Sequence, residues 1–279
     1  MSELDPKRDR VALVTGAGTG IGRAIAAKLG RLGWRVAIGG RRAEPLAETA
    51  ALVEQAGGRC FAHALDVTDP DSVEHFFTRA EEELGRVTVA INNAGIGPCG
   101  PLVELTPAEI GAAVATKLTG SLYVARRAIQ SMRAGGVGGD VLFISSSSAV
   151  QPWPFHLPYA AASAGVEHAA RMLRLELEGT GIRVNVLRCG ETAGTEFALR
   201  DLGTERMAAA HQWWFRRGVL RHAGLMTPDV VADAVVAAVT LPMAYQYELT
   251  ALVPVAPIGE LPASYEDLIA DLMRHLPSS

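Results

Sequence analysis

Short apolar runs alternate along the chain with longer segments whose apolar residues recur every three or four positions. The short runs are typical of buried parallel strands, and the periodic segments are typical of helices with one buried face. The predicted strands cover 11–15, 34–40, 60–67, 87–95, 140–148, 181–190 and 247–255. The predicted helices cover 21–33, 43–58, 70–85, 106–133, 158–178 and 227–241. This alternation predicts one α/β fold, a parallel sheet with helices on both faces.

Glycines interrupt the pattern directly after the first strand, in the stretch TGAGTGIG at 15–22. Gly16, Gly20 and Gly22 lie between a strand and a helix, at the spacing of a dinucleotide-binding turn. Residues without a Cβ let the backbone turn tightly and approach a pyrophosphate, whose charge meets the N–H groups at the helix N-terminus. The stretch therefore predicts a nucleotide site.

The end of the second strand indicates which nucleotide binds. An NAD-specific site has an acidic residue there for the ribose hydroxyls, whereas this chain has Arg41 and Arg42. Guanidinium groups suit a 2′-phosphate, so NADP is predicted ahead of NAD. The alternative is that both arginines are simply solvated at the start of a surface helix.

Length and composition narrow the class of protein. The 279 residues, 49% of them hydrophobic, fit one large domain, although two small ones are also compatible with this length. A net charge of −4 argues against nucleic-acid binding. The charged first ten residues and the lack of a long apolar run favour a cytoplasmic protein without membrane contact. Three scattered cysteines and the absence of clustered ligands predict neither disulfides nor a metal site.

Five motifs occur together: TGAGTGIG, Asp66-Val67, NNAG at 92–95, ISS at 144–146, and Tyr159. Their types, order and spacing resemble the short-chain dehydrogenase/reductase family over roughly 11–255. The resemblance implies a single Rossmann-type, doubly wound domain across 1–279, with a seven-stranded parallel sheet. Within it, 9–190 would form the cofactor-binding core, 191–226 a substrate lid, and 227–279 the last helix, last strand and tail.

The resemblance also assigns cofactor contacts. It implies that Asp66 meets the adenine amino group and that Asn93 to Gly95 form the wall beside the ribose. The nicotinamide carboxamide would be held by Thr192, or by Thr195 because this loop is one residue longer than usual. The expected cofactor-binding residues are Gly16, Gly18, Thr19, Gly20, Ile21, Gly22, Arg41, Arg42, Asp66, Val67, Asn93, Ala94, Gly95 and Thr192.

The same resemblance makes Tyr159 the proton-transfer residue and Ser146, thirteen positions earlier, the donor to the substrate oxygen. The chemistry requires such groups, because hydride transfer to a carbonyl leaves negative charge on its oxygen. A hydroxyl beside it is a preorganised donor. With an ordinary pKa of about 10, tyrosine needs a nearby cation to favour its phenolate.

The expected cation is missing from its usual position. Ser163 replaces the lysine expected four residues after Tyr159, while Lys117 replaces an asparagine of the preceding helix. We hypothesise a relocated lysine: Lys117 lowers the pKa of Tyr159, and Ser163 takes over the contact to the nicotinamide ribose. The alternative for Lys117 is a solvated helix residue.

Aromatic residues around the lid suggest an apolar or aromatic carbonyl substrate. The expected walls are Trp153, Phe155, Trp213, Trp214 and Phe215, and His156 and His211 are also close in this reading. The favoured function is an NAD(P)-dependent oxidoreductase interconverting a carbonyl and an alcohol. The alternatives are an inactive NADP-binding regulator or scaffold, and a lyase or epimerase that needs further acid/base groups. The resemblance implies a homodimer or homotetramer paired through helices 106–133 and 158–178.

Overall fold

A seven-stranded sheet forms the centre of the protein, whose computed structural model describes residues 10–195, 204–256, 258 and 260–275. Its order is β3-β2-β1-β4-β5-β6-β7, and every neighbouring pair is parallel. The strands are β1 (Val11–Thr15), β2 (Arg35–Gly40), β3 (Arg59–Ala64), β4 (Val89–Asn92), β5 (Gly139–Ser146), β6 (Ile182–Cys189) and β7 (Thr250–Leu252). The order confirms the predicted doubly wound, Rossmann-type fold.

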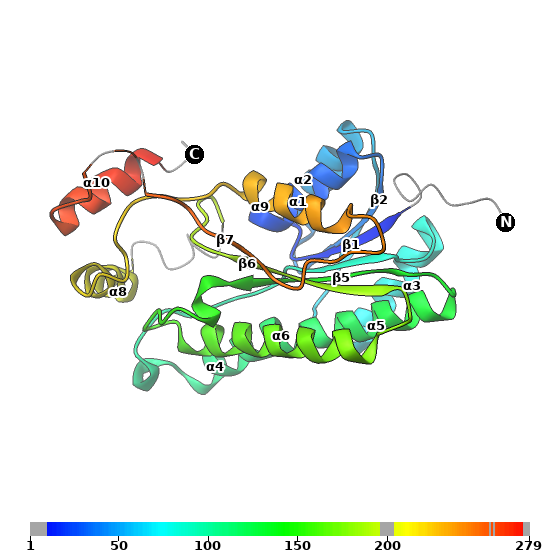
Figure 1. The fold of residues 1–279 in the computed structure, drawn as a ribbon, viewed down its shortest axis with the longest axis horizontal. Coiled ribbons are helices and arrows are strands. Elements are labelled where there is room, and N and C mark those ends of the chain that lie inside the picture. The colour runs from blue at the N-terminus through cyan, green and yellow to red at the C-terminus, as the bar shows by residue number, and fades with distance from the viewer. Residues whose placement is uncertain (1–9, 196–203, 257, 259, 276–279) are drawn as a thin grey trace.

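Helices cover both faces of the sheet (Figure 1). One face carries α1 (Gly20–Arg31), α2 (Ala43–Gln55) and α9 (Pro228–Val239). The other carries α3 (Pro70–Leu84), α4 (Pro107–Val114), α5 (Gly120–Ala134) and α6 (Leu157–Glu176). Successive strand residues point to opposite faces, so Leu13 enters one core and Val14 the other. Both faces are buried, which explains the nearly continuous apolar strands.

Two helices outside this layered core lie beyond the carboxyl ends of the strands, at the left of Figure 1. They are α8 (Glu205–Arg216) and α10 (Tyr265–His275), neither of which was predicted. Thr204 caps α8 by accepting from the N–H of Met207 at 3.2 Å. Ser264 and Asp267 form the reciprocal cap of α10. Part of the predicted lid, 196–203, lies outside the described residues.

The long helix predicted over 106–133 is not continuous. It begins as expected, with a capping box between Thr106 and Glu109, and then passes through a π-helical turn, Ala115–Thr119, between α4 and α5. A π turn adds a residue to one turn and so changes which side chains face inward; such turns are frequent at functional sites. The change matters here because the turn contains Lys117, whose side chain is buried.

The amino ends of the strands are joined by a buried ionic cluster centred on Asp140 of β5. Its carboxylate accepts from Arg10 at 2.6 Å, from Arg183 at 2.7 and 2.9 Å, and from Asn185 at 3.2 Å. Arg183 also donates to the carbonyls of Leu241, Pro242 and Tyr245. The cluster therefore fastens β1, β5 and β6 to the segment after α9, at the end of the sheet opposite to α8 and α10.

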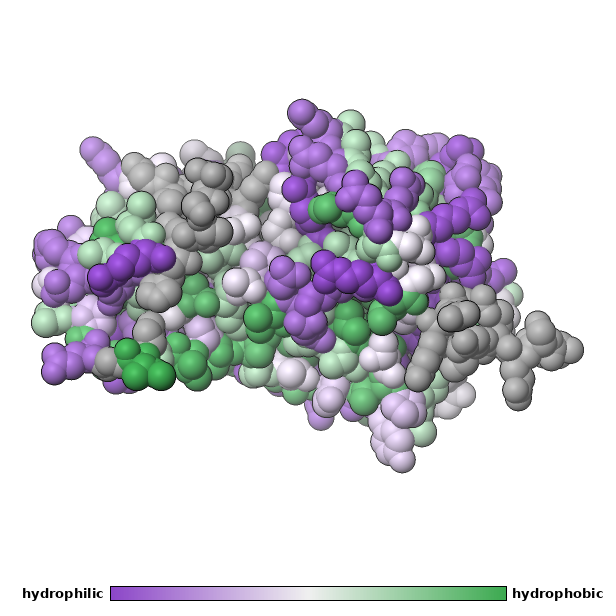
Figure 2. Space-filling model, turned by 90° about the horizontal axis from the view of Figure 1, so that it is seen from above, coloured by the Kyte–Doolittle hydropathy of each residue, from purple (hydrophilic) through white to green (hydrophobic). Residues whose placement is uncertain are grey.

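Polar and apolar residues are interspersed on the face shown in Figure 2. Across the described parts of the chain, none of the helices combines the length and low polarity that crossing a bilayer requires.

Candidate active site

A cavity of about 1160 Å³ opens at the carboxyl ends of the strands. Strand order reverses there between β1 and β4, the point where open α/β sheets bind their ligands. The predicted site residues that line it are Gly16, Gly18, Thr19, Gly20, Ile21, Arg41, Arg42, Asp66, Val67, Asn93, Ala94, Gly95, Lys117, Ser146, Tyr159 and Thr192. Gly22 and Ser163 are the predicted site residues that lie behind its wall.

The glycine-rich turn has the shape that a pyrophosphate needs. Gly16 has a φ of 63°, in the left-handed region. Arg23 donates to the carbonyl of Gly18 at 2.6 and 2.9 Å, and Thr49 donates to that of Ala17 at 3.0 Å, which fixes the turn against α2. No side chain of the described residues caps the start of α1, so its N-terminal N–H groups are available to an anion. These residues fit a dinucleotide.

Gly22→Ala is expected to weaken NADPH binding at least about tenfold, or about 1.4 kcal/mol. An added Cβ at Gly22 would lie 2.3 Å from the carbonyl oxygen of Gly16 and 2.7 Å from Nδ2 of Asn93, so the turn must move. Fluorescence titration with NADPH measures the effect. Gly111→Ala is the matched control, since a Cβ there meets nothing within 4 Å. Equal affinities for both variants would contradict this prediction.

The wall beside the turn is built from the NNAG stretch after β4. Thr15 Oγ1 accepts from the N–H groups of Asn93 and Ala94, both at 3.0 Å, and Asn93 Nδ2 donates to the carbonyl of Thr15 at 2.9 Å. Asp66 Oδ1 accepts from the hydroxyl and N–H of Thr68, which hold the pKa of Asp66 below its ordinary value. An ionised, fixed carboxylate therefore lines the cavity.

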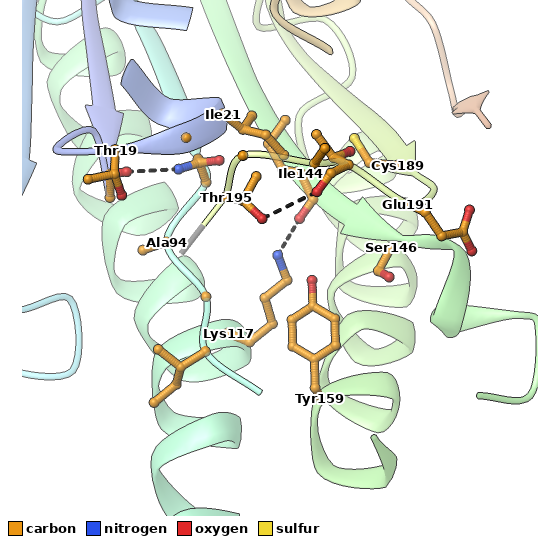
Figure 3. Close-up of a pocket in the computed structure, with 18 of the residues that line it drawn as sticks. Thr19, Ile21, Ala94, Lys117, Ile144, Ser146, Tyr159, Cys189, Glu191 and Thr195 are labelled. Atoms are coloured by element: carbon orange, nitrogen blue, oxygen red, sulfur yellow. Dashed lines mark hydrogen bonds between the residues drawn. The ribbon is translucent and has the colours of Figure 1, made fainter. Parts of the chain in front are cut away.

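Tyr159 and Ser146 meet at the opposite end of the cavity (Figure 3). Tyr159 lies in the first turn of α6, where the helix dipole favours negative charge. Burial raises the pKa of Tyr159 to about 12, while the hydroxyls of Ser146 and Ser163 lower it. Ser146 Oγ is itself held by Ser148, whose hydroxyl and N–H donate at 3.0 and 3.2 Å. The structure thus brings the predicted proton donor and oxyanion donor together.

Lys117 reaches the same place from the π turn. Its ammonium donates to the carbonyl of Ile144 at 2.5 Å and lies 5.6 Å from the ring centroid of Tyr159. A Cβ on Gly95 would be 3.6 Å from both Nζ of Lys117 and the Tyr159 ring, so the ammonium lies beside the predicted ribose wall. Burial lowers the pKa of Lys117 to about 8. Lys117 is therefore not the solvated helix residue of the alternative interpretation.

Ser163 has a different position from the one its predicted role requires. Its side chain is fully buried and does not line the cavity, so a ribose contact does not follow from its position. Ser163 lies one helical turn after Tyr159 on α6, and its short side chain does not extend past the tyrosine to the cavity. The Ser163 hydroxyl is directed at Tyr159 and lowers the pKa of that phenol.

The end of β6 and the loop after it supply the remaining wall near Tyr159. Cys189 lines the cavity as a neutral thiol, because burial raises its pKa to about 12. Thr192 and Thr195 both line the cavity, so the choice between them for the carboxamide stays open. The Thr192 hydroxyl donates to the carbonyl of Gly190 at 3.1 Å, and that of Thr195 donates to the carbonyl of Thr192 at 3.4 Å.

The aromatic wall is smaller than predicted. Trp153, His156, His211 and Trp214 line the cavity, whereas Phe155, Trp213 and Phe215 do not. Successive helical residues point about 100° apart, so only one of the three adjacent aromatics on α8 faces inward. Trp214 packs edge-on against Trp153 with ring centroids 5.1 Å apart and donates to the carbonyl of Pro154 at 2.9 Å. Burial lowers the pKa of His211, which favours its neutral form.

Sequence reasoning missed two parts of the site. Ile269, Leu272 and Met273 of α10 line the cavity, although they lie in the predicted tail; their helical spacing was the available signal. Glu167, two turns after Tyr159 on α6, is buried against Arg188 of β6. Among the described residues, no group of His, Cys, Asp and Glu side chains is placed to hold a metal ion.

Comparisons with known proteins agree with this geometry. Residues 10–202 match the short chain dehydrogenase family, to which the chain therefore belongs. The probable oxidoreductase EphD of Mycobacterium tuberculosis is 30% identical over 83% of this chain, which spans only 39% of that relative's length. The 3beta-hydroxysteroid dehydrogenase 1 of Eggerthella lenta is 34% identical over 67% of this chain and 72% of its own.

Among solved structures, the alcohol dehydrogenase of the archaeon Thermococcus sibiricus, complexed with 5-hydroxy-NADP, is similar with a TM-score of 0.75 and 28% identity. That likeness covers 90% of this chain and 99% of the other. It therefore includes much of the chain beyond residue 202, where the family match ends.

Proposed function

We propose that this protein interconverts a carbonyl compound and an alcohol with NADP as the hydride carrier. One observation carries the proposal: the Lys117 ammonium and the Ser146 hydroxyl converge on Tyr159, at the end of a cavity whose other end is a dinucleotide turn. This arrangement contains a cation, a donor and a proton-transfer group, although the cation comes from a different helix than the family pattern provides.

In the reduction direction, bound NADPH supplies a hydride to the carbonyl carbon. Ser146 donates a hydrogen bond to the carbonyl oxygen and stabilises the negative charge that develops there. Tyr159 transfers its phenolic proton to that oxygen, which completes the alcohol and leaves a tyrosinate. The Lys117 ammonium and the N-terminus of α6 stabilise the tyrosinate, which then regains a proton from solvent.

The proposed substrate is a bulky apolar carbonyl compound. Trp153 and Trp214 form one wall beyond Tyr159, and apolar residues of α8 and α10 continue it. The cavity, at about 1160 Å³, is larger than the roughly 300–1,000 Å³ usual for one small ligand, which supports a second ligand beside the dinucleotide. The similarity to a hydroxysteroid dehydrogenase supports this size class.

Arg41→Ala and Arg42→Ala are each expected to weaken NADPH binding about tenfold, with NADH binding changed less than twofold. Both side chains line the cavity at the end of β2, and a hydrogen bond to a charged group contributes about 1.5–3 kcal/mol. Fluorescence titration with each nucleotide measures the ratio. Arg31→Ala, exposed at the end of α1, is the matched control. An equal loss for NADPH and NADH would show that the arginines do not read the 2′-phosphate.

Two other functions make different demands on the site. A regulator or scaffold that only binds NADP needs neither a cation nor a donor at Tyr159, and the convergence of both favours catalysis over it. A lyase or epimerase on this fold would return the cofactor unchanged. Net consumption of NADPH separates the proposed oxidoreductase from both.

We also propose that the chain forms a homodimer or homotetramer. The outer side of α6 exposes Leu157, Met172 and Leu175, which supports pairing through this helix. Light scattering coupled to size-exclusion chromatography reports the state directly: a dimer or tetramer is expected, and a monomer at micromolar concentration contradicts this part.

The test of the proposed function is NADPH oxidation by the wild type, with NADH in parallel, across ketones, aldehydes and quinones of increasing size. We expect turnover with NADPH that improves with apolar bulk. Tight NADPH binding without turnover on any compound would overturn the proposal in favour of the non-catalytic function.

A further inference from the structure

A buried carboxylate lies behind the reacting residues and outside the cavity. Glu167 is 4% exposed, and both of its oxygens are engaged. Oε1 accepts from Ser145 Oγ and from Arg188 Nε, both at 2.8 Å, and Oε2 accepts from Arg188 Nη2 at 2.6 Å. The two-bonded fork between a guanidinium and a carboxylate fixes both distance and orientation.

The three residues of this network are each tied to a different element of the site. Ser145 directly precedes Ser146 on β5, and Arg188 directly precedes Cys189 on β6. Glu167 follows Tyr159 by two helical turns, so both lie on the same side of α6. The carboxylate therefore joins the strand that carries the oxyanion donor to the helix that carries the proton donor.

Burial of an ion pair is by itself weak support for stability, because apolar residues of similar volume often stabilise a protein equally well. Apolar contacts are not directional, so they do not fix the orientation of neighbouring side chains as hydrogen bonds do. Proton transfer between Tyr159 and a substrate held by Ser146 depends on their spacing, and a displacement of about 1 Å can reduce a rate about a hundredfold. The hydrogen bonds of Glu167 link the strand of Ser146 to the helix of Tyr159, so they act on the spacing between these two residues.

We propose that Glu167, held by Arg188, is a positioning residue that fixes Ser146 and Tyr159 relative to each other through Ser145. The inference rests on the proposed function, since it assigns Glu167 a part in that reaction. Neither Glu167 nor Arg188 lines the cavity, so both act through their neighbours.

The first test is Ser145→Ala, which removes the link to β5 and leaves the Glu167–Arg188 ion pair intact. We expect kcat to fall about tenfold, with the KM for the carbonyl compound and the affinity for NADPH changed less than twofold. Ser131→Ala is the matched control: Ser131 is equally buried and donates to the carboxylate of Glu81, away from the site. A kcat for Ser145→Ala equal to that of the control would overturn the inference.

The second test separates positioning from folding. The double variant Glu167→Leu/Arg188→Leu removes both charges and keeps apolar volume, so its urea midpoint should stay close to that of the wild type. We expect its kcat to fall at least tenfold. The pKa of Tyr159 should also rise in the pH profile, because β5, which carries the Ser146 hydroxyl that lowers this pKa, is no longer tied to α6 through Glu167. A stable double variant with unchanged kcat and pH profile would show a purely structural role.

A third readout does not depend on turnover. The ¹³Cζ resonance of Tyr159, assigned by its loss in Tyr159→Phe, reports the hydrogen bonding of the phenol. It should shift in Ser145→Ala and not in Ser131→Ala. If the wild type lacks turnover, the proposed function fails, and this resonance still decides the positioning role: a shift supports it, and an unchanged resonance overturns it.

Discussion

Lys117→Met is expected to lower kcat for NADPH-dependent reduction at least a hundredfold, about 2.7 kcal/mol of transition-state stabilisation. The variant keeps the length and apolar stem of the side chain but removes the cation 5.6 Å from the Tyr159 ring. Without it, the tyrosinate formed during reduction has lost the ammonium that lies beside its ring in a buried site. Steady-state kinetics at saturating NADPH measures the effect.

The pH dependence of the reduction is a second test of the Lys117 cation. Burial lowers the pKa of Lys117 to about 8, so wild-type reduction should decline as pH rises through about 8 and the ammonium loses its proton. Lys117→Met should lack that decline. Lys28→Met is the matched control, because Lys28 lies on α1 beside Asp229 and does not line the cavity. Unchanged turnover and pH profile in Lys117→Met would refute the relocated cation.

Stability provides a readout of the same lysine without catalysis. Because the pKa of Lys117 falls from 10.5 to about 8 on folding, the unfolded chain holds more protons from this group between those values. Its contribution therefore makes the free energy of unfolding rise with pH across that window. The difference in unfolding free energy between wild type and Lys117→Met should follow this rise, as urea titrations at pH 7 to 10 would show.

Asp140→Ala is expected to lower the free energy of unfolding by about 3–5 kcal/mol. The carboxylate is fully buried and holds the guanidinium groups of Arg10 and Arg183, both nearly buried themselves. Its removal leaves two positive charges side by side without the compensating negative charge. Urea unfolding measures the loss, which should appear in the midpoint with little change in slope.

Two further variants serve as controls for Asp140→Ala, one at an exposed carboxylate and one that keeps the size of the Asp140 side chain. Asp229→Ala removes an exposed carboxylate 3.9 Å from Lys28 and should cost less than about 1 kcal/mol. Asp140→Asn keeps the size of the side chain and should give an intermediate loss. The cluster lies at the opposite end of β5 from Ser146, so folded Asp140→Asn should retain the wild-type kcat. Equal stability of the Asp140 and Asp229 variants would show that the cluster does not hold the sheet together.

The sheet could be predicted because each strand and turn is determined by residues that are close together in the sequence. Apolar runs such as that of β1, and glycines at the strand-to-helix turn, determine strand, turn and helix without reference to distant residues. The meeting of Gly16 and Asn93 follows for the same reason, since these residues come directly after the paired strands β1 and β4. These features appear in the structure where the sequence placed them.

The reaction end depends on details that spacing does not contain. The π turn that buries Lys117 has no distinct composition, so the helix was predicted as continuous. The position of Ser163 one turn after Tyr159 determines the side of α6 on which it lies. It does not determine whether the short side chain reaches the cavity or stays buried behind its wall. The Glu167–Arg188 pair joins residues on different elements and is visible only after folding. Helix α10 was missed because its apolar face is short and its partner surface is distant in sequence.

The most direct test of the account follows the hydride itself. The wild type would be incubated with NADPH carrying deuterium at C4 of the nicotinamide, in each of its two configurations, and with bulky apolar ketones. Mass spectrometry would then examine the products. The account predicts an alcohol with deuterium on the former carbonyl carbon from one of the two labelled forms. NADPH that binds but gives no labelled product with any ketone would contradict it.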